Sequence, residues 1–264
     1  MQRTWSKGVE IAFDDVGKGE PVIVLIHGSF GNRSYYSGVA SRLSDHHRVI
    51  SVDLRGHGDS GVPETGYLLD DFATDVIAVC REAGVDRAVL VGHSAMGNVA
   101  MLAAAREPSL AAGVVMLDGA VLMPDALRAE TIKSFIPLLE GPDWLDALRG
   151  FFSNLMFGPF DPPEVKERIM RDLDTAPAQI AGPLWRDIFR GDFAEELETT
   201  RCPLLYIHAQ IPSELDRLRA LRPDAIVVSV VASGHFMMLV VPEQVAAMID
   251  RFVEVLPIAA AAYA

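Results

Sequence analysis

Residues 89–97 have the sequence VLVGHSAMG. An apolar run ends abruptly there at Ser94, and the small residues that follow predict a helix that ends at Pro108. A strand that turns sharply into a helix at a serine can expose that hydroxyl as a nucleophile, typically in the pattern G-x-S-x-G. In this chain Met96 occupies the place of the second glycine, which comes one residue later, at Gly97. Ser94 is therefore either a nucleophile on a strained turn or a serine that caps a helix.

Apolar runs and helical patterns alternate on both sides of this stretch. Residues 9–15 alternate with period two and predict an edge strand. Continuous apolar runs, typical of strands covered on both faces, occupy residues 21–28, 47–53, 87–93, 113–119, 202–209 and 226–235. Residues 67–84 carry apolar side chains at helical spacing, and residues 242–256 predict a final helix. This β-α-β repetition predicts an α/β protein with a mostly parallel sheet and helices on both faces.

The repetition is interrupted over residues 120–200, where strand patterns disappear and helical patterns dominate. One apolar stripe includes Leu148, Phe152 and Met156, and another includes Trp185. We interpret this segment as a helical cap insertion folded over the sheet. The core domain then comprises residues 1–119 and 201–264.

Composition excludes several classes of function. The chain has 264 residues, with 23 Lys and Arg against 36 Asp and Glu, so its net charge of −13 disfavours binding to nucleic acid. No apolar run approaches the roughly 18 residues that cross a membrane, and the N-terminus lacks the apolar region of a signal peptide. Cys80 and Cys202 match no metal or redox spacing, so we expect reduced thiols and a cytoplasmic protein.

Three reactive side chains follow the predicted strands, and their order along the chain suggests a catalytic triad. Ligands of open parallel sheets bind beyond the carboxyl ends of the strands, so residues just after each strand are candidates for chemistry. Ser94, Asp118 and His235 occupy such places, in the order serine, acid, histidine. A base that accepts the proton of a serine hydroxyl makes it a usable nucleophile, and an acid can orient that base.

Four segments together resemble the α/β-hydrolase fold superfamily, and the likeness extends over essentially the whole chain. They are LIHGSFGN at 25–32, SVDLRGHGDSG at 51–61, VGHSAMG at 91–97 and ASGHFMMLVVPEQV at 232–245. The resemblance implies a mostly parallel eight-stranded sheet with helices on both faces and a helical cap. It also implies a serine hydrolase that needs no cofactor and no metal.

Carried over residue by residue, the resemblance assigns a role to each candidate. Ser94 would be the nucleophile and His235 the general base. The backbone N–H groups of Ser29 and Ala95 would form the oxyanion hole.

The acid has more than one candidate in the sequence. Most of the superfamily places it after the seventh strand, where this chain has Ile211 and Pro212. A minority places it after the sixth strand, and Asp118 stands there. We therefore expect Asp118, with Glu214 and then Asp216 as alternatives.

The substrate is expected to be a small, moderately apolar carboxylic ester or lactone, because no cluster of lysine or arginine demands an anion. The candidate pocket residues are Phe30, Met123, Phe152, Trp185 and Met237. C–C bond hydrolysis, lyase chemistry and cofactor-free dioxygenation use the same fold and stay open as alternatives. The dioxygenase pattern has histidine directly after the serine, where this chain has Ala95. The sequence does not determine the oligomeric state.

Met96 makes the turn around Ser94 unusual. Glycine at this position lets the first turn of the helix pack closely against its neighbours. We therefore expect small residues to face Met96, or a slightly displaced helix, with Gly97 making the closest contact.

Overall fold

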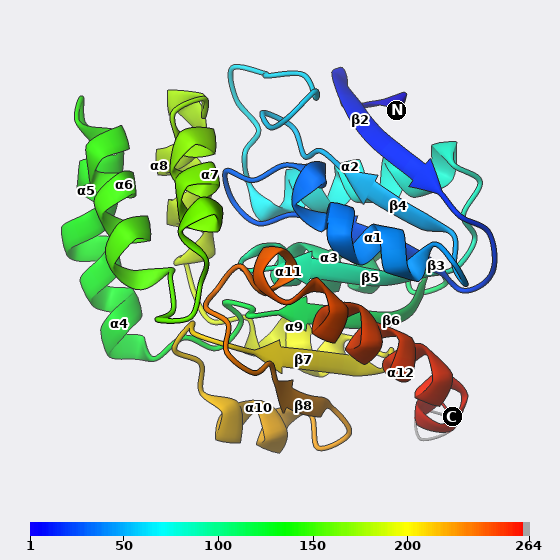
Figure 1. Ribbon diagram of the computed structural model, residues 1–264. Helices are drawn as coiled ribbons and strands as arrows, with labels where there is room; N and C mark the ends of the chain where they lie inside the picture. Colours follow the sequence, from blue (N-terminus) through cyan, green and yellow to red (C-terminus); the bar gives the residue numbers. More distant parts are fainter. Residues whose placement is uncertain (261–264) are drawn as a thin grey trace.

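A computed structural model describes residues 1–260 and contains one eight-stranded sheet in the order β1-β2-β4-β3-β5-β6-β7-β8 (Figure 1). The strands are β1 (Gln2–Ser6), β2 (Val9–Val16), β3 (Val22–Ile26), β4 (Val49–Val52), β5 (Ala88–His93), β6 (Ala111–Leu117), β7 (Leu204–His208) and β8 (Ile226–Ser229). The strands from β3 to β8 pair in parallel, and only β1 with β2 and β2 with β4 pair antiparallel. The predicted α/β-hydrolase fold with a mostly parallel sheet is confirmed.

The edge of the sheet differs from the prediction. Residues 9–15 belong to β2, which is covered on one side by β1 and paired with β4 on the other. The outermost strand is β1, because residues 2–6 form a hairpin with β2 that the turn at Gly8 closes with φ of 80°.

Helices cover both faces of the sheet. They are η1 (Arg33–Tyr36), α1 (Ser37–Leu43), α2 (Leu69–Glu82), α3 (Met96–Arg106), α10 (Leu215–Leu221), α11 (Met237–Val240) and α12 (Pro242–Ala260). In Figure 1, α1 and α12 lie side by side in front of the sheet, whereas α2 and α3 lie behind it. Every residue of β3, β5 and β6 is buried, which explains their continuous apolar sequences.

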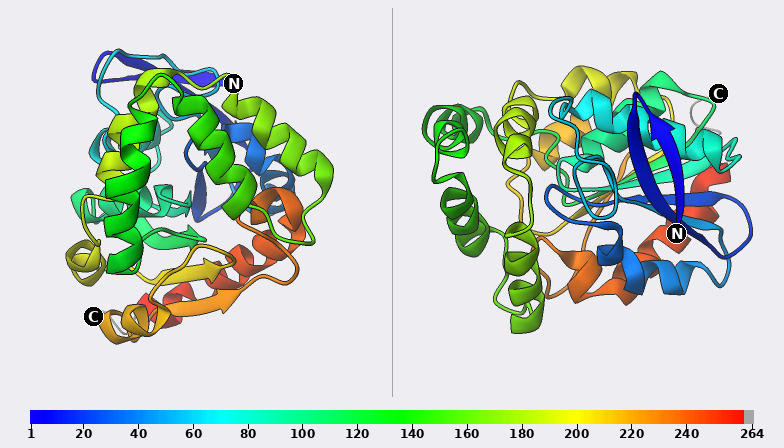
Figure 2. Two further views of the ribbon diagram at one scale, coloured as in Figure 1. Left: turned by 90° about the vertical axis from the view of Figure 1, so that its left-hand side faces the viewer. Right: turned by 90° about the horizontal axis from the view of Figure 1, so that it is seen from above.

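The segment between β6 and β7 is helical. It contains α4 (Asp125–Glu130), the π-helical turn η2 (Thr131–Phe135), α5 (Ile136–Leu139), α6 (Trp144–Leu155), α7 (Pro163–Leu173), α8 (Ala178–Ile188) and α9 (Ala194–Thr199). Most of these helices stand beyond the carboxyl ends of the strands, where Figure 2 shows α4 to α8 in front of the sheet edge. Among residues 1–260, no helix is long and apolar enough to cross a membrane.

The turn at Ser94 is accommodated differently from our expectation for Met96. Met96 is fully buried, and the closest approach falls on Gly92 rather than on Gly97. A Cβ atom on Gly92 would lie 2.0 Å from the carbonyl oxygen of Met96, whereas one on Gly97 would lie 3.2 Å from the Met116 side chain. The turn brings the backbone of Met96 against Gly92, near the end of β5. Glycine is therefore required at position 92, the residue before His93 at the end of β5.

Candidate active site

Ser94 occupies the strained turn between β5 and α3. Its φ is 58°, a left-handed conformation that is uncommon for a residue with a side chain. The Ser94 N–H donates to the carbonyl of Leu117 at 2.9 Å, which ties the turn to the end of β6. Strain of this kind persists only where the surroundings impose it, and it concentrates at functional sites.

Asp118 and His235 are joined at the adjacent strand ends. The Nδ1–H of His235 donates to Oδ2 of Asp118 over 2.7 Å, and both side chains are buried. Burial would raise the pKa of Asp118, but the bonds from His235 and from the backbone N–H groups of Ala209 and Ile211 lower that pKa to about 2. Asp118 is therefore an ionised carboxylate that holds the imidazole with its Nε2 free.

The alternative acids lie elsewhere. Glu214 pairs with Arg217 at 3.1 Å near the start of α10, and Asp216 is fully exposed and pairs with Arg219. His235 contacts Asp118 rather than either of these acids.

The segment after β7 contributes backbone N–H groups to the site rather than an acid. The N–H groups of Ala209, Gln210 and Ile211 converge on Oδ1 of Asp118 at 2.8, 2.9 and 3.2 Å. The segment with no acid thus supplies the donors that stabilise the carboxylate of the neighbouring strand. His208, which sequence reasoning missed, also lies beside this carboxylate, 3.6 Å from Oδ1.

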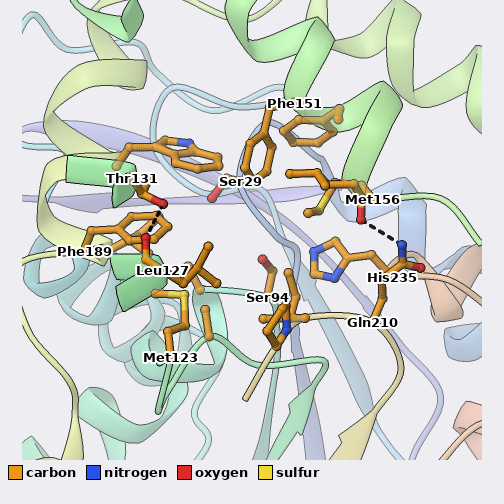
Figure 3. A pocket seen from close by; sticks show the side chains of 18 of the residues that line it. Ser29, Ser94, Met123, Leu127, Thr131, Phe151, Met156, Phe189, Gln210 and His235 are labelled. Carbon is orange, nitrogen blue, oxygen red and sulfur yellow. Dashed lines mark hydrogen bonds between the residues drawn. The ribbon is translucent and has the colours of Figure 1, made fainter. Parts of the chain in front are cut away.

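Ser94 and His235 line one cavity (Figure 3). The oxygen of Ser94 lies on the same side of this cavity as the His235 ring. The neighbouring His93 donates its Nε2–H to the carbonyl of His235 at 2.9 Å. Burial lowers the pKa of His93 well below its usual value, and the proximity of His235 acts in the same direction. His93 is therefore a neutral contact for the backbone of His235.

Two backbone N–H groups are available beside Ser94. Within residues 1–260, neither Ser29 nor Ala95 uses its N–H in a hydrogen bond, and both residues line the cavity. A Cβ on Gly28 would lie 2.5 Å from Nδ1 of His93, so only glycine lets the loop that carries Ser29 approach the turn this closely. The next N–H along that loop, of Phe30, is occupied by Nε2 of His57 at 3.1 Å.

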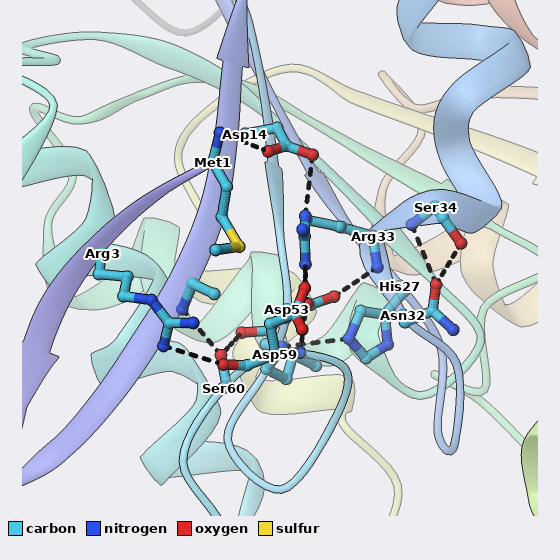
Figure 4. Close-up of polar contacts among 12 residues, drawn as sticks. Met1, Arg3, Asp14, His27, Asn32, Arg33, Ser34, Asp53, Asp59 and Ser60 are labelled. Carbon is cyan, nitrogen blue, oxygen red and sulfur yellow. Dashed lines mark hydrogen bonds and ion pairs between the residues drawn. The ribbon is translucent and has the colours of Figure 1, made fainter.

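The loop after β4 holds the Ser29 loop in place (Figure 4). The buried Asp53 accepts the backbone N–H of Arg33 at 2.6 Å and that of Asp59 at 2.8 Å. The Arg33 side chain also pairs with Asp53, and it contacts Asp14 at 2.8 Å and Asp59 at 2.8 Å. His27 accepts the N–H of Leu54 at 3.1 Å, which adds a second connection. The D-x-R-G-x-G-x-S segment therefore supports the loop and lines no part of the cavity.

The cavity measures about 310 Å³ and is mostly apolar. Met123, Phe152 and Trp185 line it, as we expected, but Phe30 and Met237 do not. Phe30 has φ of 62° and packs its ring 6.2 Å from His57 and 6.3 Å from Phe152. Met237 starts α11 and is fully buried. Phe30 therefore packs against Phe152 of the lining, and Met237 belongs to the buried core.

Sequence reasoning missed several residues of the lining. They include Leu127, Thr131, Ile188, Phe189, Gln210 and Phe236. Phe236 directly follows His235 in a recognised segment, but the others belong to no motif, and only the fold brings these segments together. No lysine or arginine lines the cavity among the described residues, and in the same part of the chain no cluster of His, Cys, Asp or Glu could hold a metal ion.

Comparison with known proteins agrees with this geometry. Residues 23–248 match the model of the alpha/beta hydrolase family. A 2-(acetamidomethylene)succinate hydrolase of Mesorhizobium japonicum is 30% identical over 254 residues, which cover 89% of this chain and 88% of that protein. The chain belongs to the alpha/beta hydrolase family, and it is an enzyme of the hydrolase class.

Solved structures show the same fold. A thermophilic esterase from Thermogutta terrifontis superposes with a TM-score of 0.84 at 24% identity, over 97% of this chain and 99% of the esterase. Est816, an N-acyl homoserine lactone degrading enzyme, superposes with a TM-score of 0.82 at 24% identity, over 95% of this chain and all of that one (100%).

Proposed function

We propose that the protein is a serine hydrolase that cleaves an uncharged carboxylic ester or lactone through an acyl-enzyme. The observation that carries the proposal is the contact of 2.7 Å between Asp118 and His235, beside a strained Ser94 in the same cavity. Asp118 fixes the imidazole as the Nδ1–H tautomer, so Nε2 is left to act as a base toward the serine.

Acylation uses the groups on both sides of Ser94. Nε2 of His235 takes the hydroxyl proton while Oγ of Ser94 bonds to the carbonyl carbon of the substrate. The N–H groups of Ser29 and Ala95 stabilise the oxyanion of the tetrahedral intermediate. His235 then gives the proton to the alcohol oxygen as the C–O bond breaks, and the acyl group remains on Ser94.

Deacylation repeats these steps with water. His235 takes a proton from the water molecule as its oxygen attacks the acyl carbon. The bond to Ser94 then breaks, and the proton returns from Nε2 to Oγ. The products are a carboxylic acid and an alcohol, which remain one molecule when the substrate is a lactone.

The lining of the cavity supports an uncharged substrate. The cap contributes mostly apolar and aromatic side chains, and among the described residues no lysine or arginine lines the cavity to pair with a carboxylate. The Mesorhizobium relative is named for a succinate derivative, a dicarboxylate. We therefore propose that this chain acts on a different substrate from that relative.

The test is turnover of short p-nitrophenyl esters and labelling by a fluorophosphonate. Ser94→Ala is expected to abolish labelling and to lower kcat by about 10⁴-fold or more, because the nucleophile is removed. Ser41→Ala removes an exposed serine of α1 and serves as the matched control, with both signals retained. Full turnover by Ser94→Ala would show that the proposal is wrong.

The same assay also tests 2-(acetamidomethylene)succinate, the compound in the name of the Mesorhizobium relative. Release of products from 2-(acetamidomethylene)succinate faster than from any neutral ester would contradict the proposed substrate class while leaving Ser94 as the nucleophile.

A further inference from the structure

The loop that carries His235 is held by the cap as well as by the core. The contacts come from the short segment of residues 155–161, which begins at the last residue of α6 and leads toward α7. This segment carries none of the catalytic or oxyanion residues predicted from the sequence.

Asp161 makes the main contact. Its Oδ1 accepts the N–H of Gly234 at 2.7 Å, and its Oδ2 accepts the N–H of Gly158 at 2.9 Å. Gly234 directly precedes His235. A Cβ on Gly234 would lie 2.4 Å from Oδ2 of Asp161 and 2.4 Å from the nitrogen of Gly158, so this approach requires glycine. Two charge-assisted hydrogen bonds to one partly buried carboxylate make a strong local connection.

His235 itself is fixed at both of its backbone groups. Its N–H donates to the carbonyl of Met156 at 3.2 Å, and its carbonyl accepts Nε2–H of His93 at 2.9 Å. The first contact comes from the same cap segment as Asp161, and the second comes from the turn that carries Ser94. The imidazole therefore depends on a backbone position that the cap and the core determine together.

The same cap segment also contacts Gln210, a residue that bonds to the acid Asp118. The side chain of Gln210 donates to the carbonyl of Leu155 at 2.8 Å and to that of Phe157 at 3.3 Å, while its backbone N–H donates to Asp118. One cap segment thus contacts the backbone beside the base and the backbone that stabilises the acid.

We propose that Asp161 is a positioning residue that holds the backbone before His235, so that the imidazole lies correctly between Asp118 and Ser94. The inference rests on the proposed function, because it assigns Asp161 a part in the action of His235. An error of about 1 Å in the placement of a reacting group can cost about 10²-fold in rate.

The experiment compares Asp161→Ala, Asp161→Asn and Asp174→Ala on the full chain. Alanine removes both acceptors, whereas asparagine keeps one carbonyl oxygen for Gly234. Asp174 is the matched control, because this cap aspartate is half exposed and pairs with Arg149 on the neighbouring helix. Rates are expressed per active site titrated with a fluorophosphonate, so loss of folded protein does not lower them.

We expect Asp161→Ala to lower kcat on p-nitrophenyl esters by about 10- to 100-fold with KM changed less than about twofold. Asp161→Asn is expected to recover most of this loss, and Asp174→Ala to resemble the unaltered protein. A rise in KM alone, or an equal loss in Asp174→Ala, would mean that Asp161 only supports the cap, and would overturn the proposal.

A second readout does not depend on turnover. The imidazole proton between His235 and Asp118 is expected to give a far-downfield proton NMR signal in the unaltered protein and in Asp174→Ala, and to be lost in Asp161→Ala. Persistence of that signal in Asp161→Ala would contradict the positioning role. Failure of the unaltered protein to react with the fluorophosphonate would instead contradict the proposed function, so the two failures can be told apart.

Discussion

The carboxyl edge of the sheet and the helical cap form the same cavity in different ways. The edge contributes buried polar groups, each held by defined hydrogen bonds, as Asp118 is by the backbone after β7. The cap contributes apolar surface from α6 and α8, including Phe152 and Trp185, whose rings pack on other rings. Asp161 is one of the places where the cap adds a polar contact to the edge.

Under the proposed function, this difference assigns the chemistry to the edge and the choice of substrate to the cap. Polar groups of the edge cannot be replaced without leaving a buried partner unsatisfied, which costs about 1–3 kcal/mol or more. Apolar groups of the cap can be exchanged for others of similar volume at a cost of less than about 1.5 kcal/mol. Variants of the edge are therefore expected to lose rate, and variants of the cap to change selectivity.

The largest expected effect distinguishes the two candidate acids. Asp118→Asn is expected to lower kcat by about 10⁴-fold, because an amide in its place favours the wrong imidazole tautomer. Glu214→Gln is expected to leave kcat within about twofold, since Glu214 pairs only with Arg217 and with the backbone of Leu122. Steady-state kinetics on a neutral ester measures both, and the reverse result would move the acid to the loop after β7.

A smaller effect concerns the pH dependence of the edge. Burial lowers the pKa of His27 to about 4, with a backbone bond to Gly28 opposing it, and lowers the pKa of His57 to about 3. Both rings accept a backbone N–H at Nε2, which requires the neutral form. Below pH 6.5 the unfolded chain binds protons that the folded chain does not, so the free energy of unfolding falls as the pH falls.

The loss is expected to reach about 3 kcal/mol for each histidine by pH 4. The pKa of Asp118 is lowered to about 2, so its stabilising contribution declines only below about pH 3.8 and does not interfere with this window. Urea denaturation between pH 4 and 7 measures the slope, which is how steeply the free energy of unfolding changes with pH. His57→Gln is expected to flatten it, and the exposed His46→Gln to leave it unchanged. An equal slope in all three proteins would contradict the assignment.

The smallest expected effect lies in the cap. The ring of Trp185 lies 4.8 Å from that of Phe151 and 5.6 Å from that of Phe189 beside the cavity. Trp185→Ala is expected to change the ratio of kcat/KM between butyrate and acetate esters by about 10-fold, because the pocket gains volume. Labelling of Ser94 by a small fluorophosphonate is expected to stay within about twofold.

Phe160→Ala is the matched cap control, because Phe160 is 71% exposed and does not line the cavity. If Trp185→Ala lowered the labelling of Ser94 by as much as it changed the ratio of kcat/KM between the two esters, the cap would affect the chemistry as well. That result would contradict the proposed division between edge and cap.

Much of the fold could be predicted from local patterns. Continuous apolar runs identified β3 to β7, because strands covered on both faces need apolar side chains at every position. An apolar run also identified β8, although the residues of this edge strand are exposed or half-buried. The hairpin of β1 was missed because residues 2–6 are mostly exposed and carry no apolar pattern. The contact of Gly92 was missed because it depends on the path of the backbone after Ser94, which no side-chain pattern records.

The sequence by itself determined the class of protein and the order serine, acid, histidine along the chain, since both follow from strand patterns and the residues just after them. Only the tertiary structure decided which acid meets the histidine. Asp118 and His235 are 117 residues apart, and their meeting depends on how neighbouring strand ends and loops approach in space. The same holds for Asp161, whose contact with Gly234 joins two segments that share no periodicity or motif. Short-range patterns report burial and helical spacing, but contacts between distant loops are set by packing of the whole fold.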